Sequence, residues 1–142
     1  MFIEWLGVDL FLNIKKRQHF QPLAPIVLEE DFEKYFSINK SIVKNLEWMG
    51  TLCDAKQTLY NKYSSIIHVD GTCRTQIIKD KNSITYKILK NMKNYGSDIL
   101  VNTSFNISKD PVVFDLFDVY VNMKRMEIEF ILMDDGLYQI KN

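Results

Sequence analysis

The sequence is short of the residues on which several classes of protein depend. Its 142 residues include two cysteines, Cys53 and Cys73, which are too few for a disulfide scaffold and show no CxxC spacing. HExxH motifs, DxDxDG loops and Cys/His clusters are also missing, so we predict no metal site built by this chain. The Walker GxxxxGK[ST] and Rossmann GxGxxG patterns are absent as well, so any nucleotide binding has to use a different fold.

Neither sign of charge predominates. Eighteen basic residues balance eighteen acidic ones, so no global field attracts nucleic acid or anionic lipid, and any anion site is expected to be local. No uncharged run approaches the roughly 20 residues of a membrane-spanning helix. The apolar N-terminus contains Glu4 and Asp9 and lacks the basic start of a signal peptide. We therefore expect a cytoplasmic protein that binds no membrane, with nucleic acid an unlikely partner.

The pattern of apolar residues predicts one mixed α/β domain over residues 1–142. Apolar residues make up 46% of the chain, and no repeat or low-complexity linker divides it. Residues 54–63 are open to interpretation as a loop or a poor helix. We predict helices over residues 26–36, from residue 82 or 83 to residue 95, and over residues 115–123. We predict strands over residues 46–52, 65–78 and 99–101, and a hairpin over residues 128–140. This alternation predicts an α/β or α+β fold with a mixed sheet.

Two segments combine positive charge with a constrained backbone. In Lys15-Lys-Arg-Gln-His-Phe-Gln-Pro-Leu-Ala-Pro25, two prolines follow a basic cluster and would hold its cations on a rigid loop. In His68-Val-Asp-Gly-Thr-Cys-Arg-Thr-Gln76, strand alternation places His68, Asp70, Thr72, Arg74 and Gln76 on one face, unless Gly71 introduces a bulge. Arg74, held by Asp70 or Gln76, could there bind phosphate oxygens in a bidentate manner. A solvated basic loop and an edge strand are the simpler interpretations of these two segments.

A third segment, Asn102-Thr-Ser-Phe-Asn106, directly follows the predicted strand 99–101. Ligands of open α/β sheets lie beyond strand ends, where hydroxyl and amide groups could bind phosphate. No GxSxG elbow surrounds Ser104, so we assign it as a hydrogen-bond donor and predict no catalytic nucleophile. From these residues alone, an Asx or Ser/Thr turn that closes the strand and needs no ligand is the favoured interpretation. The turn Ser108-Lys-Asp-Pro-Val112 adds a weaker signal.

Taken in order, these segments resemble the C-terminal domain of the carbamoyltransferase family, which includes nodulation and antibiotic-tailoring O-carbamoyltransferases. The family pattern runs KxRExFRPFAP, HVDGTARxQ, a helix that ends in glycine, and NTSFN before a proline-containing turn. The matching parts of this chain are residues 15–25, residues 68–76, Gly96, residues 102–106 and residues 110–113.

The resemblance implies a YrdC-like fold, a twisted mixed sheet with helices packed on it, that binds ATP, with or without Mg²⁺, and carbamoyl phosphate to form carbamoyl-adenylate. The resemblance also implies that four residues bind the phosphates of ATP and carbamoyl phosphate, namely Lys15, Arg17, Arg74 and Ser104. Six further residues are expected to line the site, namely His68, Asp70, Thr72, Asn102, Thr103 and Asn106. Such chemistry moves charge between phosphates, so it requires fixed cations and donors more than a side-chain nucleophile.

Two departures from the family pattern matter. Gln21 stands where the family has the second arginine of the first block, which removes one cation. The family's large N-terminal domain, which holds the metal and transfers the carbamoyl group, is missing from these residues. The first hypothesis is therefore an adenylate-forming half that needs a partner chain with that transferase domain. The alternative is a non-catalytic module that binds a small ligand or a partner; RNA binding is a weaker third option, since the chain has no basic stripe with interleaved aromatics.

Overall fold

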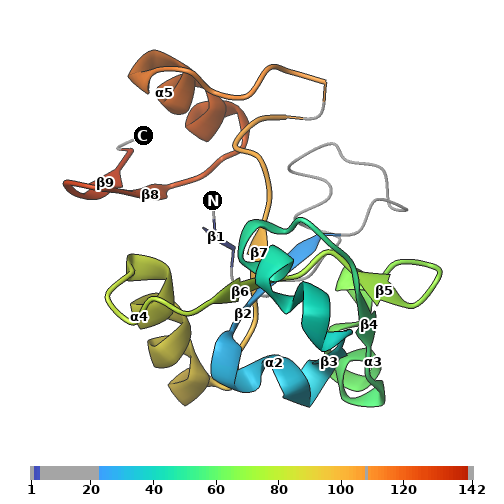
Figure 1. The fold of residues 1–142 in the computed structure, drawn as a ribbon. Coiled ribbons are helices and arrows are strands. Elements are labelled where there is room, and N and C mark those ends of the chain that lie inside the picture. The colour runs from blue at the N-terminus through green and yellow to red at the C-terminus, as the bar shows by residue number, and fades with distance from the viewer. Residues whose placement is uncertain (1, 4–22, 108, 141–142) are drawn as a thin grey trace. The chain divides into compact units, whose positions relative to one another are not determined.

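The computed structural model describes residues 2–3, 23–107 and 109–140, which belong to two compact units (Figure 1). The described part of unit 1 comprises residues 2–3 and 23–103. The described part of unit 2 comprises residues 104–107 and 109–140. The expectation of one family domain over residues 1–142 stays a prediction.

A four-stranded mixed sheet is the centre of unit 1. Its strands lie in the order β1 (Phe2–Ile3), β7 (Leu100–Asn102), β2 (Ala24–Leu28) and β6 (Gln76–Ile78). β2 runs parallel to β6 and antiparallel to β7, which is itself antiparallel to β1. The sheet is thus mixed, as the sequence predicts.

The helix α4 (Ile84–Met92) packs its apolar residues on this sheet. Leu89 is fully buried and contacts a cluster of Ile26, Leu28 and Leu100. Ser83 caps the helix by accepting a hydrogen bond from the Tyr86 amide, and the short 3₁₀ helix η3 (Lys93–Tyr95) continues it to Gly96, whose φ is 83°. The predicted start and end of this helix are confirmed.

A second, three-stranded antiparallel sheet in unit 1 has the order β3 (Phe36–Ser37), β4 (Cys53–Ala55) and β5 (Thr72–Cys73). Along the chain, the helix α2 (Glu29–Tyr35) directly precedes β3, and the helix α3 (Gln57–Tyr63) lies between β4 and β5. The 3₁₀ helix η2 (Ser64–Ile66) extends α3. Cys53 and Cys73 face each other across β4 and β5, and both are buried free thiols. The structure therefore shows no disulfide between them.

Two predicted elements of unit 1 are wrong. Residues 26–28 belong to β2 and do not begin a helix, and Pro25 lies inside the same strand. Ile26, Val27 and Leu28 are all buried, and a strand that is buried on both faces has a continuous apolar run in its sequence. Residues 46–52 form no strand: the 3₁₀ helix η1 (Lys40–Trp48) includes residues 46–48, and residues 49–52 form a turn and loop. Asn39 caps η1 by accepting a hydrogen bond from the Ser41 amide.

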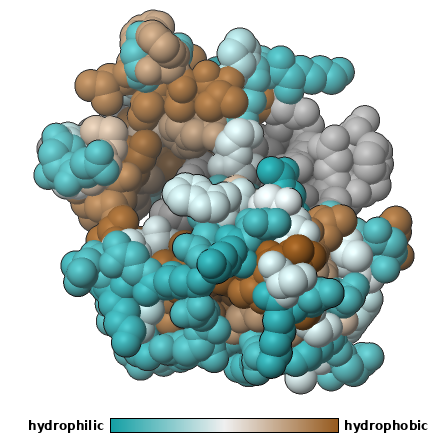
Figure 2. All heavy atoms as spheres, viewed as in Figure 1, coloured by the Kyte–Doolittle hydropathy of each residue, from teal (hydrophilic) through white to brown (hydrophobic). Residues whose placement is uncertain are grey.

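Unit 2 contains the helix α5 (Leu116–Arg125) and a hairpin of β8 (Phe130–Met133) and β9 (Gly136–Gln139). Asp115 caps α5 by accepting a hydrogen bond of 2.8 Å from the Asp118 amide. Both elements confirm their predictions. Figure 2 shows much apolar surface over these elements. The exposed large apolar residues in the described part of unit 2 are Val112 and Phe114 before α5, and Leu116, Phe117, Tyr120, Phe130, Leu132, Leu137 and Tyr138 in the three elements.

None of the helices in the described part of the chain is long and apolar enough to cross a membrane.

Candidate functional site

The register of the sheet in unit 1 brings polar residues from distant parts of the chain to one edge. Ala24 pairs with Asn102, and Ile26 pairs with Gln76. The amino ends of β2 and β6 therefore lie at the same edge as the carboxyl end of β7. Arg74 lies two residues before β6 begins. We call the group of Arg74, Gln76 and Asn102 the polar edge.

Arg74 is the cation of the polar edge. Its side chain is exposed, whereas the neighbouring Cys73 and Thr75 are fully buried. Arg74 Nε donates a long hydrogen bond of 3.4 Å to the Met49 carbonyl oxygen. Among the described residues, no carboxylate forms an ion pair with Arg74. The prediction that Asp70 or Gln76 holds this guanidinium is wrong, because a backbone carbonyl at the end of η1 does so.

Gln76 and Asn102 supply amide groups beside this cation. Gln76 Nε2 donates a hydrogen bond of 3.0 Å to the Glu47 carbonyl oxygen. Asn102 Nδ2 lies 3.5 Å from Gln76 Oε1 and 3.4 Å from the Met49 sulfur. The side chain of Glu47 accepts a hydrogen bond of 2.6 Å from Lys79, which anchors the end of η1 to the residue after β6. The end of η1 is thus joined to both strands of the polar edge.

The alternation predicted for residues 68–76 holds only in part. Cys73 and Thr75 are buried, while Arg74 and Gln76 lie on the opposite face. Val69, by contrast, is fully exposed, since the chain turns at residues 68–71 and Gly71 adopts a φ of 83°. The expected continuous strand over 65–78 is therefore divided into η2, the turn, β5 and β6.

Three predicted site residues bond to one another within this turn. Thr72 donates hydrogen bonds to Asp70 Oδ1 through its backbone nitrogen and through Oγ1, at 3.0 and 2.7 Å. Thr72 Oγ1 also lies 3.2 Å from His68 Nδ1. The hydrogen bonds from Thr72 lower the pKa of Asp70 below its usual value. His68, Asp70 and Thr72 thus shape the turn that leads into β5.

Lys15 and Arg17 lie outside the described residues. Ser104 and Asn106 belong to unit 2, and Asn102 and Thr103 belong to unit 1. Asn106 is mostly buried and donates a hydrogen bond from Nδ2 to the Asp110 carbonyl oxygen, so it closes the turn before Pro111. Of the ten predicted site residues, the polar edge contains Arg74 and Asn102, and the convergence of all four phosphate-binding residues on one pocket stays a prediction.

A cluster around Asp98 was missed by the sequence analysis. Asp98 is 6% exposed, and its carboxylate accepts hydrogen bonds from the hydroxyls of Tyr35 and Tyr63 at 2.6 and 2.8 Å. Lys34 and Lys62 approach it to 2.6 and 3.4 Å. Asp98 therefore joins the ends of α2 and α3 to the loop before β7. It lies at the opposite end of β7 from Asn102, so we consider it structural.

The charges of this cluster support one another. Burial disfavours ionisation of Asp98, but the hydrogen bonds from Lys34, Tyr35 and Tyr63 outweigh it and lower the pKa of this carboxyl below its usual value. The same bond to Asp98 raises the pKa of Lys34. The feature of the sequence that could have indicated this cluster is a Lys-Tyr dipeptide at the end of α2 and another at the end of α3, at residues 34–35 and 62–63.

The polar edge can bind an anion or a polar planar group, but it offers no nucleophile or metal cluster. A guanidinium donates to phosphate or carboxylate oxygens, and the two amides can both donate and accept hydrogen bonds. Over residues 2–3, 23–107 and 109–140, no three His, Cys, Asp or Glu residues are grouped to hold a metal ion.

Comparison with known proteins agrees with this combination of fold and motifs. The model of the family "Carbamoyltransferase C-terminus" matches residues 7–139. The nodulation protein NolNO of Sinorhizobium fredii is 30% identical over 130 residues, which are 90% of this chain and 19% of that protein. The 3'-hydroxymethylcephem-O-carbamoyltransferase of Amycolatopsis lactamdurans is 25% identical over 133 residues, 92% of this chain and 24% of the enzyme. The chain thus spans about a fifth of the curated relatives it matches.

A solved structure has the same fold. Full-length HypF in its phosphate- and nucleotide-bound form matches 84% of this chain with a TM-score of 0.60 and 18% identity, and the match covers 15% of HypF. The predicted YrdC-like mixed α/β fold is confirmed by this likeness. From its family match over residues 7–139, the chain belongs to the family of carbamoyltransferase C-terminal domains.

Proposed function

We propose that this domain binds ATP, with or without Mg²⁺, and carbamoyl phosphate, and that it forms or holds carbamoyl-adenylate. The observation that carries the proposal is Arg74, an exposed cation without a carboxylate partner among the described residues, held at a sheet edge beside two amides. A guanidinium is always charged and matches phosphate oxygens geometrically. The segment with Lys15 and Arg17 leads into β2, whose first residue pairs with Asn102 at the same edge. We expect Lys15, Arg17 and Ser104 to complete the phosphate site.

The reaction balances without a side-chain nucleophile. Carbamoyl phosphate and water give carbamate and inorganic phosphate. A carbamate oxygen then bonds to the α-phosphorus of ATP, and the bond from that phosphorus to pyrophosphate breaks. Negative charge develops on phosphate oxygens in this step, so fixed cations such as Arg74 stabilise its transition state.

We propose further that a second polypeptide, bearing the metal-binding transferase domain of the family, completes carbamoyl transfer to an acceptor. The surface of unit 2 supports this part of the proposal. Unit 2 exposes large apolar residues such as Phe114 and Phe117, at 95% and 72%, and a concentration of such residues is typical of an interaction surface.

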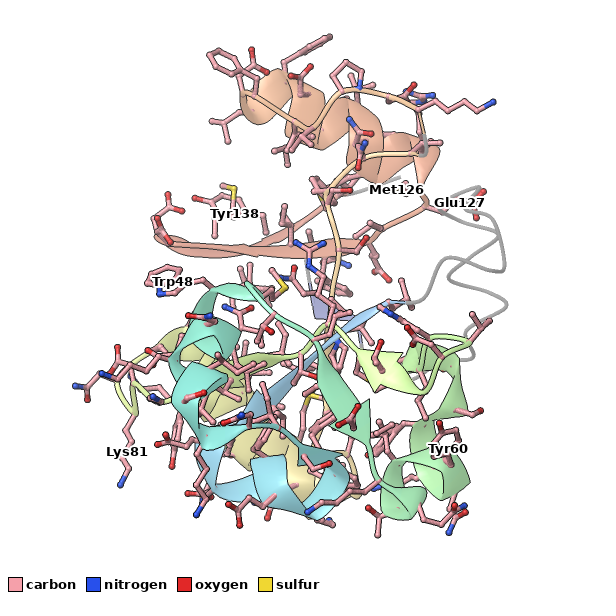
Figure 3. The ribbon with its side chains drawn as sticks, turned by 45° about the vertical axis from the view of Figure 1, so that its right-hand side comes forward. Trp48, Tyr60, Lys81, Met126, Glu127 and Tyr138 are labelled. Carbon is pink, nitrogen blue, oxygen red and sulfur yellow. The ribbon has the colours of Figure 1, made fainter. Side chains whose placement is uncertain are left out.

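Isothermal titration calorimetry of ATP and of carbamoyl phosphate tests the binding. We expect saturable binding by the wild type and a loss of about 10- to 150-fold in affinity for Arg74→Ala, since a charge-assisted hydrogen bond is removed. Lys81→Ala is the matched control: it removes one positive charge from an exposed residue before α4 (Figure 3). If the wild type binds neither ligand, the proposal is wrong, and the non-catalytic partner-binding module becomes the better description.

A further inference from the structure

A cavity in unit 1 lies apart from the polar edge. It has a volume of about 600 Å³ and is lined by residues of α2, β3, the start of η1 and β6, together with the residue before α3. α2 follows the carboxyl end of β2, whereas the polar edge lies at the amino end of that strand (Figure 1). Small-molecule sites are typically cavities of this size.

The buried part of the lining is apolar. Phe32 and Phe36 are buried, and their rings stack with 5.4 Å between the centroids. Ile77 of β6 is also buried, and the half-buried Ile38 and Val43 complete the apolar lining. Such a surface suits a large apolar side chain, because binding removes apolar area of both partners from water.

Two of the three carboxylates in the lining already have cationic partners. Glu29 Oε1 lies 3.5 Å from Lys79 Nζ, and Glu30 Oε1 lies 2.7 Å from Lys90 Nζ. A phosphate or another ligand with negative charge alone would still approach three carboxylates, and like charges that face each other are unfavourable. The cavity therefore disfavours the anions that suit the polar edge.

One charge of each sign in the lining is left without an ion pair. Glu33 of α2 and Lys40 at the start of η1 are exposed, and neither forms an ion pair within residues 2–3, 23–107 and 109–140. Lys56 is the other lysine of the lining, and its Nζ donates a hydrogen bond to the Glu33 carbonyl oxygen. A ligand that carries both an ammonium and a carboxylate can form a charge-assisted hydrogen bond with each free group.

We infer that this cavity binds a free α-amino acid with a large apolar side chain. Glu33 pairs with the ammonium of the ligand and Lys40 with its carboxylate. The side chain of the ligand packs against Phe32, Phe36 and Val43. The inference goes beyond the proposed function and does not rest on it, because the cavity and the polar edge have different lining residues and suit different ligands.

Calorimetry of the wild type with L-phenylalanine and its fragments tests the ligand class. We expect saturable binding of L-phenylalanine and weaker binding of phenethylamine, which lacks the carboxylate, and of phenylpropionate, which lacks the ammonium. L-alanine should bind more weakly than L-phenylalanine, because its side chain has little apolar surface. If phenethylamine or phenylpropionate binds as tightly as L-phenylalanine, the assignment of an amino acid is wrong.

Two variants of exposed residues test the site. Glu33→Gln and Lys40→Gln should each weaken L-phenylalanine binding about 2- to 5-fold, as expected for loss of one solvent-exposed ion pair. Glu33→Gln should not weaken phenylpropionate binding, and Lys40→Gln should not weaken phenethylamine binding. Lys44→Gln is the matched control, because Lys44 is an exposed lysine of η1 that does not line the cavity. It should bind all three ligands like the wild type.

Val43→Trp places a larger side chain in the cavity and should abolish L-phenylalanine binding. Circular dichroism checks that this variant folds, and if it does not, the two exposed variants decide. The inference is wrong if the wild type does not bind L-phenylalanine, or if Glu33→Gln and Lys40→Gln bind it like the wild type. Neither result bears on the proposed function, which the binding of ATP and carbamoyl phosphate tests separately.

Discussion

Replacing Asp98 by asparagine tests whether its cluster holds unit 1 together. Asp98 is 6% exposed, and its carboxylate accepts hydrogen bonds from two tyrosine hydroxyls and from the Lys34 ammonium, each at 2.8 Å or less. Breaking a buried charged network costs about 3–5 kcal/mol. Lys34 and Lys62 have side chains that are 55% and 46% exposed and regain water when the charge is lost. We therefore expect the free energy of unfolding to fall by about 2–4 kcal/mol for Asp98→Asn.

The same variant should change how stability depends on pH. The pKa of Asp98 is lower in the folded protein than in the unfolded chain. Its stabilising contribution is thus complete well above the unfolded pKa of about 3.9 and is lost as the pH falls through the folded value. The wild type should lose stability from about pH 5 downward, since the unfolded chain binds the proton first. Asp98→Asn should lack this part of the slope.

Urea unfolding followed by circular dichroism at pH 7 and at about pH 2.5 measures both effects. Asp54→Asn serves as the control, because Asp54 is an exposed carboxylate of β4 in the same unit. Asp54→Asn should have the same free energy of unfolding as the wild type at both pH values. Unchanged stability of Asp98→Asn at pH 7, or a pH slope equal to that of the wild type, would refute the assignment of Asp98 as a structural clamp.

Two further predictions concern the second sheet of unit 1. Burial raises the pKa of the Cys73 thiol to about 12 and also raises the pKa of the Cys53 thiol. A thiol reagent at pH 8 should therefore label neither cysteine until the protein unfolds. Rapid labelling of the folded protein would contradict this prediction. Gly71→Ala should destabilise the protein by about 1–2 kcal/mol, since Gly71 has a φ of 83° and an added Cβ would lie 3.0 Å from the Tyr60 hydroxyl; a melting temperature equal to that of the wild type would show that this turn carries no such strain.

The sequence predicted which residues belong to the candidate site better than it predicted how those residues are arranged and bonded. Strand alternation correctly placed Arg74 and Gln76 opposite the buried Cys73 and Thr75. Strand alternation failed for Val69, which it predicted to be on the buried face, because the chain turns at residues 68–71, where Gly71 has a positive φ. The partner of Arg74 was beyond the reach of a side-chain pattern, since it is the carbonyl oxygen of Met49, and any residue has such an oxygen.

The secondary structure was likewise predicted from the sequence only in part. Local signals sufficed for α4, α5 and the hairpin, where caps and turn residues act within a few positions: Ser83, Asp115, Gly96 and the Asp134-Asp135-Gly136 turn. They did not suffice for residues 26–28 and 46–48. An apolar run suits a helix or a buried strand equally, and pairing with β6 and β7 selects the strand for β2.

The sequence by itself determined the family motifs, the helix caps and the polar face around Arg74, because each depends on residue type and short spacing. Only the tertiary structure decided that Arg74, Gln76 and Asn102 share one edge, since that follows from β6 lying parallel and β7 antiparallel to β2. It also decided that Asp98 is bound by two Lys-Tyr pairs at a distance of 35 or more residues. Long-range pairing of strands and burial of charge depend on the whole chain, which no local pattern records.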